Sequence, residues 1–257
     1  MDIQQQKQFN ILLIGDSCLD VYHYGHCSRL SPEAPVPIFK QEETKVVPGM
    51  AANVKKILEN FNHNVEAHFN SEEIKKIRLV DSRFNHHLLR MDEEPADIRP
   101  FVFENKKKFD AIIVSDYNKG FVTEETATEI SQFARENKIP MFVDSKKVDL
   151  SCYEGCIIKV NANEWESLES VPTDCDFVVT LGKDGALLNN VAYPATKTEV
   201  FDVCGAGDAF LCGLAHCYLK TGDLEESMWF ANRCGAVAVG HFGTYAITLE
   251  DTNASIC

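Results

Sequence analysis

The sequence predicts an α/β protein whose mainly parallel sheet is covered by helices on both faces. Short apolar runs alternate with longer helical patterns in the second half of the chain, as at 109–115, 123–137 and 140–144. Such alternation is typical of strand–helix–strand units with parallel strands. Polar residues directly follow several of the runs, at the sheet edge where open α/β proteins bind ligands. They are Asp16, Asp116, Asp144 and Asn161.

The predicted elements follow one another from the N-terminus. The apolar run at 9–16 ends in Gly-Asp and predicts a buried strand. The segment 20–48 combines alternating stretches with four prolines, which favours a small extended flap over a helix-covered strand. Further strands are expected at 77–80, 87–91, 109–115, 140–144, 156–160 and 177–180, and helices at 48–61, 123–137, 205–220 and 224–240.

Composition and charge exclude several classes of protein. The 257 residues are 45% hydrophobic and 25% charged, which is typical of a folded chain rather than a disordered one. No apolar run approaches the roughly 18 residues of a membrane span, and the polar first ten residues do not resemble a secretory signal. A formal net charge of −14 disfavours nucleic-acid binding, because phosphate would repel the protein.

The cysteines and histidines show no metal-binding spacing. The 10 cysteines form no Cys-x-x-Cys pair, and several lie in apolar helical stretches. Buried, reduced thiols are therefore expected, together with a cytoplasmic location. The 8 histidines show no ligand spacing either, so no zinc site is expected.

The segment Gly205-Ala-Gly-Asp208 carries the sharpest chemical signal. Two glycines precede a long apolar helix, so backbone N–H groups at the positive end of the helix dipole form a place for a phosphate. A carboxylate in that turn would repel the phosphate, unless it accepts a proton from an attacking hydroxyl. An ordinary glycine-rich loop with Asp208 as a helix-start residue explains the local pattern equally well.

With its context, this segment resembles the C-terminal signature of the ribokinase-like (PfkB) sugar kinases. The segments 29–37, 48–54, 115–120 and 230–240 resemble one branch, the D-glycero-β-D-manno-heptose 7-phosphate kinases, and the motifs occur in family order from 11 to 249. In that branch the kinase is often the first half of a two-domain enzyme. The resemblance implies a ribokinase-like three-layer sandwich, with one kinase domain over 1–257. Residues 20–48 and part of 75–92 would form a small β-lid.

The implied activity is ATP-dependent phosphorylation of the anomeric hydroxyl of that heptose phosphate, a step of ADP-heptose biosynthesis. Asp208 matches the catalytic base, and Gly205, Ala206 and Gly207 match the anion hole. The positions that match sugar-binding residues are Asp16, Asp20, Gly49 and Asn53, with Lys119 as the cation of the loop between the two substrates. Those that match the ATP site are Asn161, Thr180, Gly182, Gly185, Asn232 and Gly243.

Asn161 and Glu164 match a family motif linked to Mg²⁺, although Asn-x-x-Glu is also a common helix cap. Lys76, Arg78 and Arg83 lie near the branch's phosphate-binding strand, and alternation places the first two on one face. Guanidinium groups suit phosphate, but a solvated basic face is the other interpretation. The expected partners are ATP, a sugar phosphate and a second copy bound through the β-lid, with neither nucleic acid nor membrane.

Four features depart from the family pattern. Met50 stands where a glycine is usual and would either narrow the sugar pocket or point away, and Cys204 replaces a threonine. Almost nothing is left of a strand and helix between 64 and 74, and a helix is nearly absent between 167 and 176. A partner, a rearranged loop or polar substitutions must then cover the strands. The two shortened regions and Met50 keep open a non-catalytic ligand-binding or scaffold relative. Within the family, a kinase for another sugar or a nucleoside is the other alternative, against which the basic cluster argues.

Overall fold

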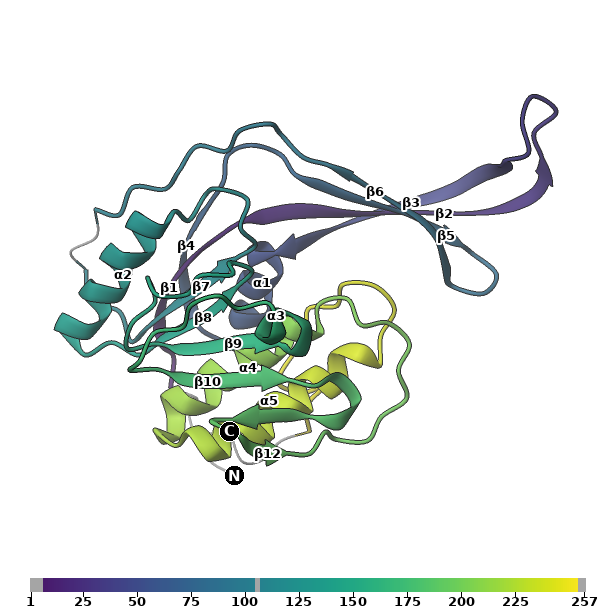
Figure 1. Ribbon diagram of the computed structural model, residues 1–257. Helices are drawn as coiled ribbons and strands as arrows, with labels where there is room; N and C mark the ends of the chain where they lie inside the picture. The colour runs from purple at the N-terminus through teal and green to yellow at the C-terminus, as the bar shows by residue number, and fades with distance from the viewer. Residues whose placement is uncertain (1–6, 105–106, 254–257) are drawn as a thin grey trace.

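Two sheets organise the chain in the computed structural model, which describes residues 7–104 and 107–253 (Figure 1). The large sheet has eight strands in the order β12-β11-β10-β9-β8-β7-β1-β4, and all but β11 and β12 pair in parallel. Its strands are β1 (Asn10–Gly15), β4 (Asn64–Phe69), β7 (Ala111–Asp116), β8 (Met141–Ser145), β9 (Ile157–Asn161), β10 (Asp176–Thr180), β11 (Ala186–Leu188) and β12 (Val191–Tyr193). The predicted α/β class is confirmed.

Helices cover both faces of this sheet. Residues of α1 (Ala51–Asn60), α4 (Ala206–Thr221) and α5 (Leu224–Val239) share one buried cluster with alternate residues of β1 and β7. The other cluster joins α2 (Glu124–Asn137) to the remaining residues of the same strands. The short helix α3 (Ala162–Glu166) follows β9. Because both faces are covered, the central strands are apolar throughout, which is why the sequence showed runs rather than alternation.

A second sheet projects from the body as a long twisted ribbon (Figure 1). Its order is β3-β2-β5-β6, with β2 (Ser17–Leu30), β3 (Pro37–Met50), β5 (Lys75–Asp81) and β6 (His86–Glu93). The segments expected to form a lid, 20–48 and part of 75–92, lie in these strands, which are longer than the sequence pattern predicted. Their role as a lid, and the single-domain organisation, stay predictions.

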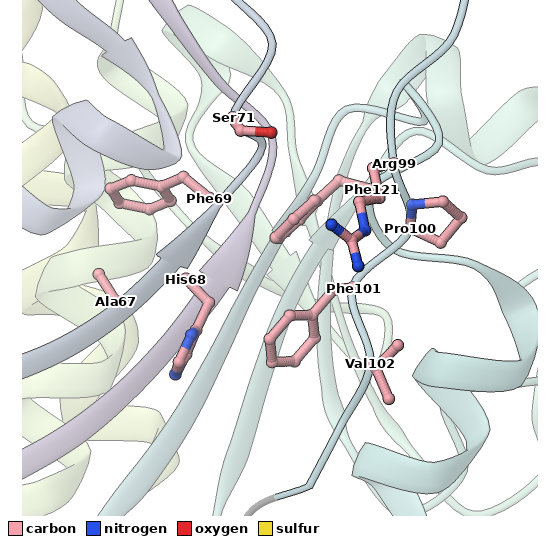
Figure 2. A pocket seen from close by; sticks show the side chains of 9 residues that line it. All are labelled: Ala67, His68, Phe69, Ser71, Arg99, Pro100, Phe101, Val102 and Phe121. Carbon is pink, nitrogen blue, oxygen red and sulfur yellow. The ribbon is translucent and has the colours of Figure 1, made fainter.

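The structure corrects the expectation for the segment after Asn64. It was expected to contribute almost nothing, yet it forms the edge strand β4, paired in parallel with β1. Short bends then lead to β5, and the missing helix is replaced in part by the loop through Phe101. The Phe101 ring lies 4.9 Å from that of His68 and 5.5 Å from that of Phe121. A rearranged loop therefore covers part of the strand and leaves a pocket of about 410 Å³ (Figure 2).

The second shortened region behaves as expected, since no helix forms at 167–176 within the described residues. The hairpin of β11 and β12 was not predicted because each strand has 3 residues, too few to show a period. Eight of the described cysteines are free thiols, but Cys217 is disulfide-bonded, so the expectation that all are reduced is wrong there. Among the residues described, each helix falls short of the length and apolarity that crossing a membrane requires.

Candidate active site

Asp208 lies in the first turn of α4, where the structure buries it to 4% exposure. Its Oδ2 accepts a hydrogen bond from Asn53 Nδ2 at 2.8 Å, and its Oδ1 accepts one from Tyr117 Oη at 3.2 Å. Burial raises the pKa of Asp208 to about 6, with the hydrogen bond from Asn53 opposing and the charge of Asp144 adding to the rise. A carboxylate that titrates near neutrality is well suited to accept a proton from a hydroxyl.

The backbone before Asp208 has the form of an anion-binding turn. Gly205 caps α4 with a φ of 77°, which glycine adopts easily. A Cβ on Gly207 would lie 2.9 Å from Lys159 Nζ, so a side chain there would displace that ammonium group. The N–H of Ala206 is partly used, since it donates to the Val203 carbonyl at 3.3 Å. The first-turn N–H groups after it have no carbonyl one turn earlier in the helix and can face an anion.

Asp16, which directly follows β1, presents an unsatisfied oxygen. Its Oδ2 accepts hydrogen bonds from the backbone N–H groups of Tyr117 at 2.7 Å and Lys119 at 3.3 Å. Its Oδ1 is buried and has no hydrogen-bond partner among the described residues. Burial, followed by the charge of Asp116, raises the pKa of Asp16. A buried carboxylate oxygen without a donor is costly, and a ligand hydroxyl would satisfy it.

Both carboxylate oxygens of Asp20 already accept hydrogen bonds from protein groups. Its Oδ1 accepts a hydrogen bond from the Arg78 guanidinium, and its Oδ2 accepts one from Thr244 Oγ1 at 2.7 Å. A Cβ on Gly49 would lie 2.4 Å from that Oδ2, which explains the glycine. Asp20 and Gly49 therefore join β2 to the loop after α5 and hold Arg78 in place. They do not present a free carboxylate of the kind seen at Asp16.

The expected nucleotide residues largely converge on one pocket of about 530 Å³. Thr180, Gly182, Gly185 and Asn232 line it together with Ala206 and Gly207 of the anion-binding turn. Its other walls include the apolar residues Val200, Val203, Phe210 and Val239. Asn232 Nδ2 donates to the carbonyls of Tyr193 at 3.0 Å and Pro194 at 3.3 Å, which ties α5 to the segment after β12. The pocket thus reaches from an apolar end to the turn before Asp208.

Gly243 is not among the residues that line this pocket, and its expected place in the ATP site stays a prediction. Its N–H donates to Asp202 Oδ2 at 3.0 Å. A Cβ there would lie 3.0 Å from the ring of Tyr22 in β2, so the turn packs against the second sheet.

The proposed metal ligands are occupied as well. Asn161 Oδ1 accepts from the Glu164 N–H at 3.0 Å, and Glu164 Oε2 accepts from the Asn161 N–H at 2.7 Å, so the two form the capping box of α3. Glu164 Oε1 pairs with Lys146 Nζ at 2.6 Å. Among the described residues, no group of three or more acidic, histidine or cysteine side chains is arranged for a metal ion. These residues do not fit a direct Mg²⁺ site.

The basic residues of the second sheet separate into two groups. Lys76 Nζ lies 4.8 Å from the centre of the Tyr117 ring, and the buried Arg78 guanidinium lies 5.2 Å from that of Tyr22. Arg83, in contrast, sits in the turn after β5 and forms a two-pronged contact with Asp81. The structure does not bring Arg83 into contact with Lys76 or Arg78 but binds it to Asp81 in the turn after β5.

Lys119 and Met50, which were also singled out in the sequence, both contact other protein groups. Lys119 Nζ pairs with Glu94 at 2.7 Å, while its N–H binds Asp16. Met50 adopts a φ of 57°, a conformation usual for glycine, and its buried side chain packs with Cys18 and Ile74. Met50 thus contributes to the apolar cluster at the junction of β2, β3 and the segment before β5.

Sequence reasoning missed Tyr117, Lys146 and Lys159. Lys159 Nζ pairs with Asp144 Oδ2 at 2.6 Å, and Lys146 Nζ with Asp144 Oδ1 at 3.0 Å. Burial opposes ionisation, yet Lys159 and Lys146 lower the pKa of Asp144 to about 2. A lysine within the apolar strand β9 was the available signal, because buried lysines need an anionic partner.

Comparisons with known proteins give the family. Residues 90–252 match the sequence model described as pfkB family carbohydrate kinase. The chain is 29% identical over 306 residues to bifunctional protein HldE of Aliarcobacter butzleri, covering 95% of this chain and 64% of that protein. With bifunctional protein HldE of Koribacter versatilis the identity is 31% over 296 residues, covering 91% and 60%. The chain therefore spans less than two thirds of the length of these curated relatives.

Solved structures show the same fold. Phosphofructokinase-2 from Escherichia coli superimposes with a TM-score of 0.71 at 16% identity, covering 96% of this chain and 97% of that one. Ribokinase from Thermotoga maritima gives a TM-score of 0.67 at 16% identity, covering 95% and 98%. The expected ribokinase-like sandwich is confirmed. The chain belongs to the pfkB family of carbohydrate kinases, phosphotransferases that act on sugar hydroxyls.

Proposed function

We propose that this kinase transfers the γ-phosphoryl group of ATP to the anomeric hydroxyl of D-glycero-β-D-manno-heptose 7-phosphate. The observation that carries the catalytic part is the position of Asp208. Its carboxylate is held by Asn53 and Tyr117, in the same helical turn as Gly207, which lines the pocket. The substrate part rests on the heptose-kinase-like segments of the sequence and on the basic side chains of β5.

Different residues bind ATP, accept the hydroxyl proton and stabilise the transferring phosphoryl group. ATP lies in the pocket lined by Thr180 and Asn232, with its phosphates directed to the N-terminus of α4. Asp208 accepts the proton of the sugar hydroxyl, whose oxygen then bonds to the γ-phosphorus while the bond to the ADP oxygen breaks. First-turn N–H groups stabilise the charge on the transferring group. Mg²⁺ would travel with the ATP phosphates, since Glu164 is engaged by protein groups.

On the sugar side, Asp16 Oδ1 is the acceptor for a sugar hydroxyl, because it is a buried carboxylate oxygen left without a donor in the described part of the chain. Lys76 and Arg78 would receive the phosphate that the substrate already carries. Asn53 links the two sides, since its amide nitrogen donates to Asp208. A protein that only bound a ligand would have no need of this carboxylate at the anion-binding turn.

The test is an assay of ADP release with ATP, Mg²⁺ and a panel of sugars, sugar phosphates and nucleosides, with ³¹P NMR to locate the new phosphate. The expected result is turnover with the heptose 7-phosphate and a product phosphorylated at the anomeric carbon. Turnover with an unphosphorylated sugar or a nucleoside would support the alternative kinase. Binding of the panel without ADP release would support the non-catalytic relative.

The second sheet is expected to join two copies of the chain. Its outer strands β3 and β6 have unpaired edges, and proteins usually cover such edges. Exposed apolar side chains lie on these strands, namely Val46, Leu88, Leu89 and Met91. Sedimentation at micromolar concentration is expected to show a dimer, and Leu89→Asp to shift it to monomer. Val148→Asp, on the exposed surface of the body, is the control and should leave the dimer intact. A monomeric wild-type chain would contradict the dimer.

A further inference from the structure

A buried ion pair lies directly beneath the anion-binding turn. Asp144 lies in β8 and Lys159 in β9, and their side chains, 2% and 3% exposed, meet at 2.6 Å. A Cβ on Gly207 would lie 2.9 Å from Lys159 Nζ and 3.9 Å from Asp144 Oδ2. The pair therefore packs against the residue before Asp208.

Stability alone does not explain this pair. Burying two charges costs free energy that their attraction repays only in part, and apolar side chains of similar size often stabilise a protein as well or better. The neighbours of Lys159 in β9 are Ile158 and Val160, both buried and apolar. Lys159 is thus a charged residue between two buried apolar residues, and its ammonium group lies next to Gly207 in the turn before Asp208.

The surroundings of Asp208 otherwise hold few charges. Asn53 of α1 and Tyr117 after β7 donate hydrogen bonds and are neutral. Cys18 of β2 and Cys212 of α4 are thiols whose pKa values burial raises, so they too are neutral. Two more lysines lie near Tyr117. Lys76 Nζ is 4.8 Å from the centre of the Tyr117 ring and Lys146 Nζ is 5.4 Å from it, and Lys146 also pairs with Asp144. Asp144 and Lys159 are the opposed charges whose side chains lie against Gly207 of the turn.

We propose that Asp144 and Lys159 are positioning residues that set the proton affinity of Asp208, and with it the lowest pH at which the kinase works. This inference rests on the proposed role of Asp208 as the base. The carboxylate of Asp144 favours a protonated Asp208, and the ammonium group of Lys159 favours an ionised one. The two charges oppose each other, so the loss of either one moves the pKa of Asp208 in the direction that the remaining charge determines.

The two single variants are expected to have opposite effects on the pH profile of kcat/KM. A base works when deprotonated, so a higher pKa of Asp208 moves the acid limb to higher pH. Lys159→Met leaves Asp144 less compensated and should move the limb up by about one pH unit or more. Asp144→Asn leaves the charge of Lys159 uncompensated and should move the limb down by a similar amount. The double variant Asp144→Asn/Lys159→Met removes both charges and should return the limb close to its wild-type position.

A matched control separates this effect from the general cost of breaking a buried pair. Lys147 pairs with the buried Asp116 on the neighbouring strand, and neither residue of that pair hydrogen-bonds to Asp208. Lys147→Met should leave the acid limb in place. A direct titration of Asp208 by NMR, with ¹³C-labelled aspartate and Asp208→Asn to assign the signal, should show the same two opposite shifts without any turnover.

The outcomes distinguish this inference from the proposed function. An acid limb that Asp208→Asn abolishes but that the Asp144 and Lys159 variants leave in place would overturn the inference alone. A kinase whose turnover survives Asp208→Asn would overturn the role of Asp208 itself. Shifts of the same sign in both single variants would also overturn the inference, because opposed charges cannot produce them. If Lys159→Met does not fold, the downward shift expected of Asp144→Asn still tests the sign, and the double variant tests the compensation.

Discussion

Asp208→Asn is expected to lower kcat by about 10² to 10⁴, the usual contribution of a general base. The amide keeps the shape of the side chain but lacks a basic oxygen for the hydroxyl proton. Asn53 can still donate to the amide oxygen, and the rotatable Tyr117 hydroxyl can accept from the amide nitrogen, so the local packing is kept. The measurement is steady-state kinetics together with ATP binding by calorimetry, in which the Kd for ATP should change little.

The loss of activity should not come from unfolding. The folded-state pKa of Asp208 is raised from 3.8 to about 6, so the folded protein binds more protons than the unfolded chain between these values. The ionised carboxylate therefore costs stability above pH 6, and the Asp208→Asn substitution would remove that cost. Thermal melts at pH 8 are expected to show a Tm at least as high as that of the wild type.

Asp202→Asn is the matched control for this experiment, because Asp202 lies in the same loop and accepts backbone hydrogen bonds from Cys204 and Gly243. It should keep kcat within several-fold of the wild-type value. If Asp208→Asn instead kept more than about half of the wild-type kcat, proton transfer to this carboxylate would not limit the reaction.

The second large effect concerns the phosphate that the substrate carries. Lys76→Met should raise the KM for the heptose phosphate about ten- to a hundred-fold, since a charge-assisted contact contributes roughly 1.5–3 kcal/mol. The KM for ATP should barely change, because the nucleotide pocket is lined by other elements. Initial rates with each substrate varied in turn provide both constants.

Arg78 needs a more conservative change, because its guanidinium also neutralises the buried Asp20. Arg78→Lys keeps that charge and removes the planar fork that suits phosphate, so it should raise the sugar KM without unfolding the protein. Arg83→Ala is the control and should change neither constant, since Arg83 is bound to Asp81 in the turn after β5.

The three possible results have different meanings. An unchanged sugar KM in both the Lys76 and Arg78 variants would favour an unphosphorylated substrate. An equal rise in the KM for ATP and for the sugar would indicate a folding defect or binding of the triphosphate at this strand. A rise confined to the sugar phosphate would support the proposed substrate class.

Local sequence patterns predicted the features that depend on residues close together in the chain, such as buried strands and the start of a helix. The apolar runs of β1 and β7 are buried on both faces, so composition alone was enough to identify them. For the turn before α4, the glycines and the apolar run predicted the start of a helix, while the local pattern alone allowed either an anion site with a base or an ordinary glycine-rich loop. The hairpin of β11 and β12 was missed because strands of 3 residues are too short to show a period.

The sequence by itself determined the α/β class, the kinase family through its ordered motifs, and the place of Asp208 at a helix N-terminus. The tertiary structure decided which distant residues meet. It paired Asp20 with Arg78 and Thr244, Asp144 with Lys159, and Asp208 with Asn53. It also bound Gly243 to Asp202 and Arg83 to Asp81. These contacts depend on the order of strands in the two sheets and on the faces that they turn to each other. A buried carboxylate takes whichever donor that arrangement brings within reach, and the spacing of residues along the chain does not contain this information.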